Sequence, residues 1–275
     1  MIDSTNLKQK IINIDRNSFD AVALSLFNYQ YQHNLVYQQF VNLLNINIYS
    51  IKTIEQIPFL PITFFKSRQI IDTTQQVSTI FESSGTTQQN NSRHFVADTN
   101  WYQQISQQLF ETQFGKLDDW IVLALLPSYL ERENSSLVFM VDYFINQTKN
   151  NISGFYLYNY DDLNTALQTA KKANKKVLLL GVSFALLDFA EQFPQDLSFC
   201  TIMETGGMKG KRPEMTKEAL HHILKNAFHV TRIYSEYGMT EMLSQAYSFE
   251  KGIFKTSATL KILLRNITDP FEVYS

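Results

Sequence analysis

Five consecutive small or hydroxyl-bearing residues form the first segment that could bind a ligand: Ser83, Ser84, Gly85, Thr86 and Thr87. Glycine permits backbone angles that other residues avoid, and successive backbone N–H groups in such a turn can form a nest for an anion. Arg93 and His94 follow and could close over phosphates as cations. The same composition also suits an ordinary polar hairpin loop, and no Gly-Lys-Ser/Thr sequence follows, which excludes a Walker loop.

A second segment, residues 234–241, combines an aromatic ring with groups that bind phosphate and metal. Tyr237 offers a ring face on which a purine can stack, and Gly238 lets a ligand approach the backbone. Thr240 adds a hydroxyl, and Glu241 adds a hard oxygen ligand of the kind that Mg²⁺ binds. Taken alone, these residues also fit a solvated loop without a ligand.

Two more polar segments follow predicted strands. Gly206 and Gly207 lie in residues 204–212, where a flat ligand could approach the backbone. Positive charge nearby comes from Lys209, Lys211 and Arg212. A flexible basic loop explains the same residues. Residues 126–136 could face a substrate, but their types indicate no particular chemistry.

We expect a mostly parallel α/β sheet, flanked by helices, to position these segments. Strands are predicted over residues 78–82, 93–97 (as the hairpin partner of the first), 120–126, 154–158, 176–180, 199–204 and 230–234. Helices are predicted over residues 100–114, 137–144, 161–174, 184–192 and 215–228, with Pro213 suited to the start of the last. Gly181 is expected to end the strand before it. Strands that alternate with helices favour parallel pairing, and ligands then bind beyond the carboxyl ends of the strands.

The first 56 residues are expected to form a helical segment packed on a core of residues 57–275. Apolar residues recur at helical spacing over 19–27 and 35–44, and Pro58 and Pro61 then interrupt the helical pattern. This proline-rich stretch predicts an extended crossing into the core.

Composition indicates a soluble, globular protein. Of 275 residues, 44% are hydrophobic and 18% are charged, which excludes a disordered chain. The net charge of −2 and the scattered basic residues give no case for nucleic acid. No apolar run is long enough to span a bilayer and no signal segment is visible, so a cytoplasmic location is expected. An aromatic content of 13% permits a roomy apolar pocket or an aromatic-rich core.

A single cysteine, Cys200, excludes an intramolecular disulfide and a multi-cysteine metal site. It lies within a predicted strand, where a buried structural cysteine is the commoner outcome; an acyl-accepting thiol is the alternative. His221 and His222 lie within a predicted helix, one packed and one solvated, and no third metal ligand accompanies them.

In their order and spacing, these segments resemble one enzyme superfamily. Residues 83–87 resemble the phosphate loop of the adenylate-forming superfamily of acyl-CoA synthetases, luciferases and peptide-synthetase adenylation domains. Residues 237–241 resemble its Tyr-Gly-x-Thr-Glu motif, about 150 residues downstream, with Gly206 and Gly207 between. Within the superfamily, residues 61–66 and 126–132 are similar to the acyl-protein synthetase (LuxE) branch. The resemblance extends from about Ile57 to the C-terminus.

The resemblance implies a fold like the large N-terminal domain of these enzymes and a two-step reaction. A carboxylic acid, fatty or aromatic, attacks ATP to form an acyl-adenylate, and the acyl group passes to a thiol of a protein, a carrier or CoA. It implies that residues 83–87 hold the phosphates, while Gly206, Gly207, Tyr237 and Gly238 contact adenine. Thr240 would contact the α-phosphate and Glu241 would bind Mg²⁺.

Two departures from the superfamily pattern qualify these expectations. Its phosphate loop usually continues with Gly and a Lys, but residues 88–94 read Gln-Gln-Asn-Asn-Ser-Arg-His, so Arg93 is the expected substitute cation. Its downstream Asp motif and small C-terminal lid, which carries a catalytic Lys, have no counterpart here. The expectation is therefore an N-terminal core only.

Two other functional classes compete with a ligase. One is a non-catalytic nucleotide- or acyl-binding module with an incomplete adenylation site. The other is an α/β-hydrolase, which the sequence disfavours because Gly181-Val182-Ser183 is followed by Phe184 and Ala185 and gives no Gly-x-Ser-x-Gly elbow.

Overall fold

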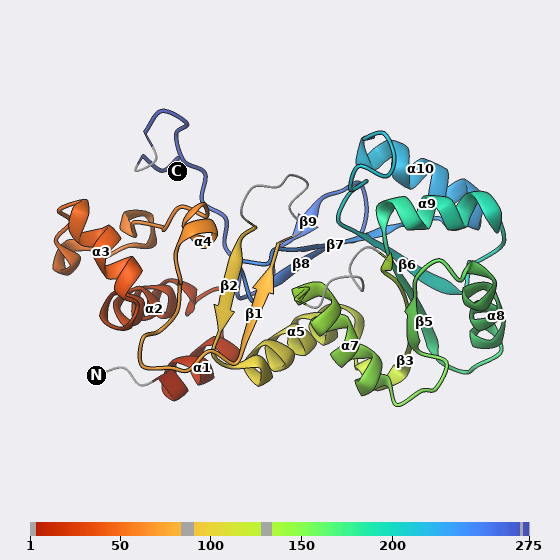
Figure 1. Cartoon of the computed structure of the whole chain (residues 1–275), viewed down its shortest axis with the longest axis horizontal. Coiled ribbons are helices and arrows are strands. Elements are labelled where there is room, and N and C mark those ends of the chain that lie inside the picture. The colour runs from red at the N-terminus through yellow and green to blue at the C-terminus, as the bar shows by residue number, and fades with distance from the viewer. Residues whose placement is uncertain (1–3, 84–90, 128–133, 270–271, 275) are drawn as a thin grey trace. The chain divides into compact units, whose positions relative to one another are not determined.

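The structure is a computed structural model that describes residues 4–83, 91–127, 134–269 and 272–274 (Figure 1). The chain divides into two compact units. Unit 1 takes its described residues from 4–83, 91–99 and the stretch from 256 onward, and unit 2 takes them from 100–255. The boundary expected at residue 57 falls inside unit 1.

Unit 1 combines short helices with a hairpin. Its elements are α1 (Ser4–Ile12), α2 (Phe19–His33), α3 (Leu35–Leu43), η1 (Ile48–Ser50), η2 (Ile54–Gln56), α4 (Phe64–Ser67), β1 (Thr79–Glu82) and β2 (Arg93–Val96). The apolar pattern correctly predicted α2 and α3, whose buried residues Phe27, Tyr37 and Val41 pack with Ile54 and Ile57. The predicted hairpin is also confirmed, because β1 and β2 pair antiparallel.

Unit 2 is built on a seven-stranded sheet of order β4-β3-β5-β6-β7-β8-β9. Its strands are β3 (Trp120–Leu125), β4 (Gly154–Tyr156), β5 (Lys176–Val182), β6 (Cys200–Thr205), β7 (Tyr234–Gly238), β8 (Gln245–Ser248) and β9 (Phe254–Lys255). Its helices are α5 (Thr99–Phe114), η3 (Leu117–Asp119), α7 (Ser136–Thr148), α8 (Tyr160–Lys171), α9 (Ser183–Gln192) and α10 (Lys217–Phe228). Pairing is parallel from β4 to β7 and antiparallel from β7 to β9, so the mostly parallel α/β class is confirmed.

The central strands are buried on both faces because helices cover both sides of the sheet (Figure 1). Every residue of β3 is buried, and in β5 only Lys176 is exposed. On one side, Phe110 of α5 packs its ring against Trp120 and Tyr247. Burial of this kind explains why these strands are nearly continuous apolar runs.

Three local predictions in unit 2 are wrong. The strand β5 runs through Gly181 to Val182, and a Cβ at Gly181 would lie 2.6 Å from Leu186 Cγ, so this glycine lets α9 pack closely on the strand. Helix α10 begins at Lys217, after the cap Thr216, and not near Pro213. The strand predicted over 230–234 is β7, which begins only at Tyr234.

Candidate functional site

The carboxyl edge of β6 and β7 brings two of the predicted ligand-binding segments together. Thr205, the last residue of β6, pairs in parallel with Glu236 of β7. Gly206 and Gly207 therefore leave β6 beside Tyr237, the next residue of the neighbouring strand. Two glycine-containing segments thus meet where ligands bind in parallel sheets.

The loop after β6 depends on its glycines. Gly206 has a φ of 69°, in the left-handed region that favours glycine. Gly207 has no atom within 4 Å of the place where a Cβ would lie, so its backbone faces open space. Met208 is buried, and its carbonyl accepts the N–H of Lys211 at 2.9 Å. The loop is therefore anchored just beyond its accessible glycines.

Arg212 ties the same loop to α9. Its guanidinium donates to Asp188 at 2.5 Å and 2.8 Å and to both carboxylate oxygens of Glu191 at 2.6 Å and 2.7 Å. Forked contacts to carboxylates are the strongest that arginine makes. Arg212 was expected to add positive charge for a ligand, but two carboxylates already engage it.

The Tyr-Gly-x-Thr-Glu residues lie at the end of β7 and in the turn after it. Tyr237 is 43% exposed, and its ring packs edge-on against Phe254 at 5.9 Å. Thr240 and Glu241 are half-buried in the turn that precedes β8. The segment was expected to follow a strand; instead Tyr237 and Gly238 are its last residues. The Tyr237 hydroxyl donates to Met239 Sδ at 3.0 Å, so the side chain is held at the edge while remaining partly exposed.

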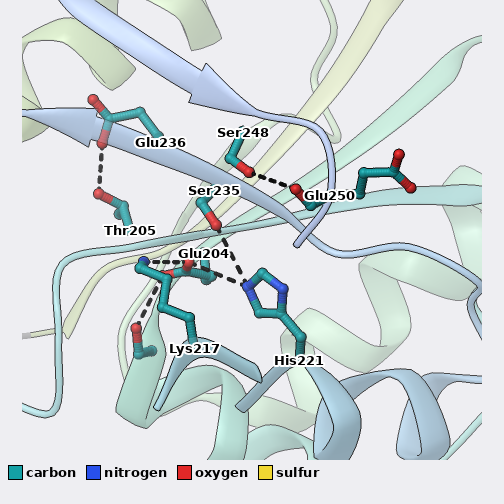
Figure 2. Close-up of polar contacts among 9 residues, drawn as sticks. Glu204, Thr205, Lys217, His221, Ser235, Glu236, Ser248 and Glu250 are labelled. Atoms are coloured by element: carbon teal, nitrogen blue, oxygen red, sulfur yellow. Dashed lines mark hydrogen bonds and ion pairs between the residues drawn. The ribbon is translucent and has the colours of Figure 1, made fainter. Parts of the chain in front are cut away.

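Glu204 is the centre of a buried polar cluster on one face of the sheet (Figure 2). Its side chain is completely buried, and Oε1 accepts a hydrogen bond from Lys217 Nζ at 2.5 Å. His221 Nε2 lies 3.4 Å from the same oxygen, and the Ser183 hydroxyl donates to Oε2 at 3.2 Å. Burial raises the pKa of Glu204, but the contacts with His221 and Lys217 outweigh it and hold the pKa below its ordinary value. The carboxylate is therefore charged and fully engaged.

The Ser235, His221 and Glu204 side chains do not form a hydrolytic triad. His221 Nε2 lies 3.4 Å from both Ser235 Oγ and Glu204 Oε1, whereas a triad uses the two ring nitrogens separately. Ser235 is also completely buried. This geometry adds a structural reason to disfavour a hydrolase.

Glu236 is a second buried acid, on the opposite face of the sheet, because neighbouring residues of a strand alternate in direction. Its Oε2 accepts a hydrogen bond from Thr205 Oγ1 at 2.5 Å (Figure 2). Burial is the main cause that raises the pKa of Glu236 to about 7; the Thr205 bond opposes the shift, and the nearby Glu204 charge adds to it. The two acids at this edge therefore differ in charge and environment.

Two predicted residues, Ser83 and Arg93, belong to unit 1. The Ser83 hydroxyl accepts the N–H of Ser92 at 2.9 Å, which closes the β1–β2 ladder. Arg93 is exposed on β2 opposite Glu82, with its guanidinium carbon 5.6 Å from the centre of the Phe95 ring. Ser84, Gly85, Thr86 and Thr87 lie outside the described residues. Their phosphate-binding role stays a prediction.

Burial distinguishes the roles open to Cys200, His221 and His222. Cys200 is buried, and burial raises the pKa of its thiol to about 12, so it stays protonated and is a poor acyl acceptor. His221 is packed and His222 is exposed, as expected. No group of three or more His, Cys, Asp or Glu side chains in the described part of the chain is arranged to hold a metal ion. A lone Glu241 still fits Mg²⁺, which is commonly bound by one or two carboxylates and substrate phosphates.

Sequence reasoning gave no role to Glu204, Lys217, Glu236 or Gln245. One signal was available: Glu204 and Thr205 end a strand that is otherwise largely apolar, and a charged group in such a run needs a partner. Lys217 carried no such signal, because only the folding of α10 onto the sheet brings it to Glu204.

Comparisons with known proteins add no family assignment. No protein-family model matches the sequence, and no curated protein matches it. None of the helices in the described ranges has the length and apolar character needed to cross a membrane.

Proposed function

We propose that this protein activates a carboxylic acid with ATP, forming an acyl-adenylate, and passes the acyl group to a protein, carrier or CoA thiol. The observation that carries the proposal is the meeting of Gly206–Gly207 with Tyr237–Gly238 at the carboxyl edge of β6 and β7. Two motifs about 30 residues apart in sequence thereby become one surface with open backbone at Gly207 and an exposed aromatic ring at Tyr237. The resemblance to adenylate-forming enzymes supports the same function.

Each residue at the edge has a distinct task under this proposal. The Tyr237 ring stacks on adenine, and the glycines let the nucleotide approach the backbone. Thr240 donates to the α-phosphate, and Glu241 holds Mg²⁺. The metal, when bound, neutralises charge on the departing pyrophosphate. The Glu204–Lys217 pair and the Arg212 contacts hold the start of α10 and the glycine loop in place.

Acid-dependent exchange of labelled pyrophosphate into ATP tests the proposal. With a panel of fatty and aromatic acids, we expect exchange with at least one acid and a loss of about a hundredfold in Glu241→Gln. Asp118→Asn, an equal change of charge at an exposed residue before β3, should exchange normally. ATP binding without exchange by any acid contradicts the proposal and favours a non-catalytic nucleotide-binding module.

A further inference from the structure

Three side chains on one face of β7 and β8, those of Glu236, Tyr247 and Gln245, form a buried polar patch. Glu236 pairs with Tyr247, and Gly238 pairs with Gln245, so these residues share the face that α5 covers. Glu236 is 6% exposed and Gln245 is 2% exposed. The three side chains are therefore shielded from water, whereas Gly238, beside them at the carboxyl edge, is exposed.

The Glu236 carboxyl points along its strand toward that edge. Its Oε1 lies 2.8 Å from the place where a Cβ at position 238 would be, so the oxygen occupies space that only glycine leaves open. Its other oxygen accepts from Thr205. A carboxyl group can accept about four hydrogen bonds, so Glu236 retains acceptor capacity. The positive charge of Lys217 acts on Glu236 from a distance, but the Lys217 ammonium is bound to Glu204 on the opposite face of the sheet.

Gln245 presents a second acceptor. Its Nε2 donates to the Ser106 carbonyl at 3.1 Å and to the Tyr247 hydroxyl at 2.8 Å. A flipped amide would set its oxygen against the Ser106 carbonyl, so this orientation is fixed. Its buried Oε1 has no hydrogen-bond partner among the described residues. Buried acceptors without a donor are rare in native proteins, and each one calls for an explanation.

We propose that Glu236 and Gln245 select a carboxylic acid that carries a hydrogen-bond donor, a hydroxyl or an ammonium group, over one with a plain hydrocarbon body. This inference rests on the proposed function. Tyr237, the proposed adenine platform, points to the face opposite Glu236 because the two residues are adjacent in β7. The acceptors are thus on the side away from adenine, where they meet the acid. A donor on the acid would supply a hydrogen bond to Glu236 Oε1 or to Gln245 Oε1.

Calorimetric binding of matched acids, in the presence of a non-hydrolysable ATP analogue, tests this selection. The aliphatic series is hexanoate, 6-hydroxyhexanoate and 6-aminohexanoate; the aromatic series is benzoate, 4-hydroxybenzoate and 4-(aminomethyl)benzoate. At least one donor-bearing acid should bind about tenfold more tightly than its parent, the usual scale for a buried or charge-assisted hydrogen bond. The hydroxyl and ammonium arms identify which donor the site takes.

Glu236→Gln keeps the side-chain shape and an acceptor for Thr205 but removes the charge. It should reduce the preference for an ammonium-bearing acid about tenfold and that for a hydroxyl-bearing acid less, since the charge-assisted bond is the stronger. Asp118→Asn should leave both preferences unchanged. Equal binding of parent and donor-bearing acids in the wild type overturns the inference, as does a preference for the ammonium-bearing acid that is undiminished in Glu236→Gln. If parent acids support pyrophosphate exchange as well as donor-bearing acids do, only the donor selection is overturned. If the protein shows neither acid binding nor exchange, the proposed function is overturned as well.

Discussion

Replacement of Glu236 with Gln should change how the stability of unit 2 depends on pH. The folded protein raises the pKa of this carboxyl from 4.5 to about 7, so the folded state binds the proton more tightly than the unfolded state. The contribution of Glu236 to the free energy of unfolding is therefore greatest below pH 4.5 and is lost as the pH rises toward 7. A difference of about 2.5 in pKa, at about 1.36 kcal/mol each, corresponds to about 3 kcal/mol.

The variant cannot ionise and should lack this loss. Between pH 5 and pH 8, Glu236→Gln should gain roughly 2 to 3 kcal/mol of stability relative to wild type. The gain is less than the full difference because the wild type already begins to lose stability between pH 4.5 and pH 5. The titratable groups around Glu236 do not change their charge in this pH range. Tyr102 and Tyr247 face Glu236 from α5 and β8, and burial raises the pKa of both, so they stay neutral. Glu204 and Lys217 lie behind the sheet as a charged pair, and the lowered pKa of Glu204 keeps it ionised across this range.

Urea denaturation at several pH values, followed by tryptophan fluorescence, measures this difference. Both tryptophans of the chain, Trp101 and Trp120, belong to unit 2, so the signal reports that unit. Asp118→Asn is the matched control and should follow the wild type. A difference between Glu236→Gln and wild type that stays constant from pH 5 to pH 8 would refute the assignment of Glu236 as a buried acid that ionises near pH 7.

Three further substitutions test the packing that supports the site. Gly181→Ala should destabilise unit 2 by about 1–3 kcal/mol in thermal unfolding, because its Cβ would clash with α9, whereas Gly154→Ala meets no atom within 4 Å and should cost less. Lys217→Met should cost about 2 kcal/mol in urea denaturation by leaving buried Glu204 without its cation, and adding Glu204→Gln should recover part of that loss; full additivity would contradict the pair. Arg212→Ala should leave the unfolding midpoint almost unchanged but let trypsin cut the loop before α10 several-fold faster, as read by mass spectrometry; an unchanged rate would show that the ion pairs do not hold the loop.

The fold class could be predicted from the sequence because the central strands carry a clear local signal. Residues 120–125 and 177–180 are unbroken apolar runs, as expected of strands buried on both faces. The bounds of the polar strand β7 were predicted wrongly because it lacks such an apolar run. Its residues Tyr234–Gly238 have no apolar pattern, and their strand geometry comes from pairing with β6 on one side and β8 on the other. Pairing between distant segments leaves no local signal.

The candidate site was predictable in its backbone but not in its buried charges. Gly206 was identified because glycine has a conformational meaning that can be read locally, and its φ of 69° fits that reading. The contact between Lys217 and Glu204, by contrast, exists only after α10 packs on the sheet. The apparent availability of Arg212 was misleading for the same reason, since its carboxylate partners lie on α9.

The claim that the carboxyl edge of β6 and β7 binds a nucleotide is tested most directly by the affinity for ATP, measured by calorimetry with Mg²⁺ present. Stacking of a base on an aromatic ring contributes about 1–3 kcal/mol, so Tyr237→Ala should weaken ATP binding by about tenfold or more. Tyr237→Phe, which keeps the ring, should bind within about threefold of the wild type. ATP binding that is unaffected by Tyr237→Ala, or absent from the wild type, would contradict a nucleotide site at this edge.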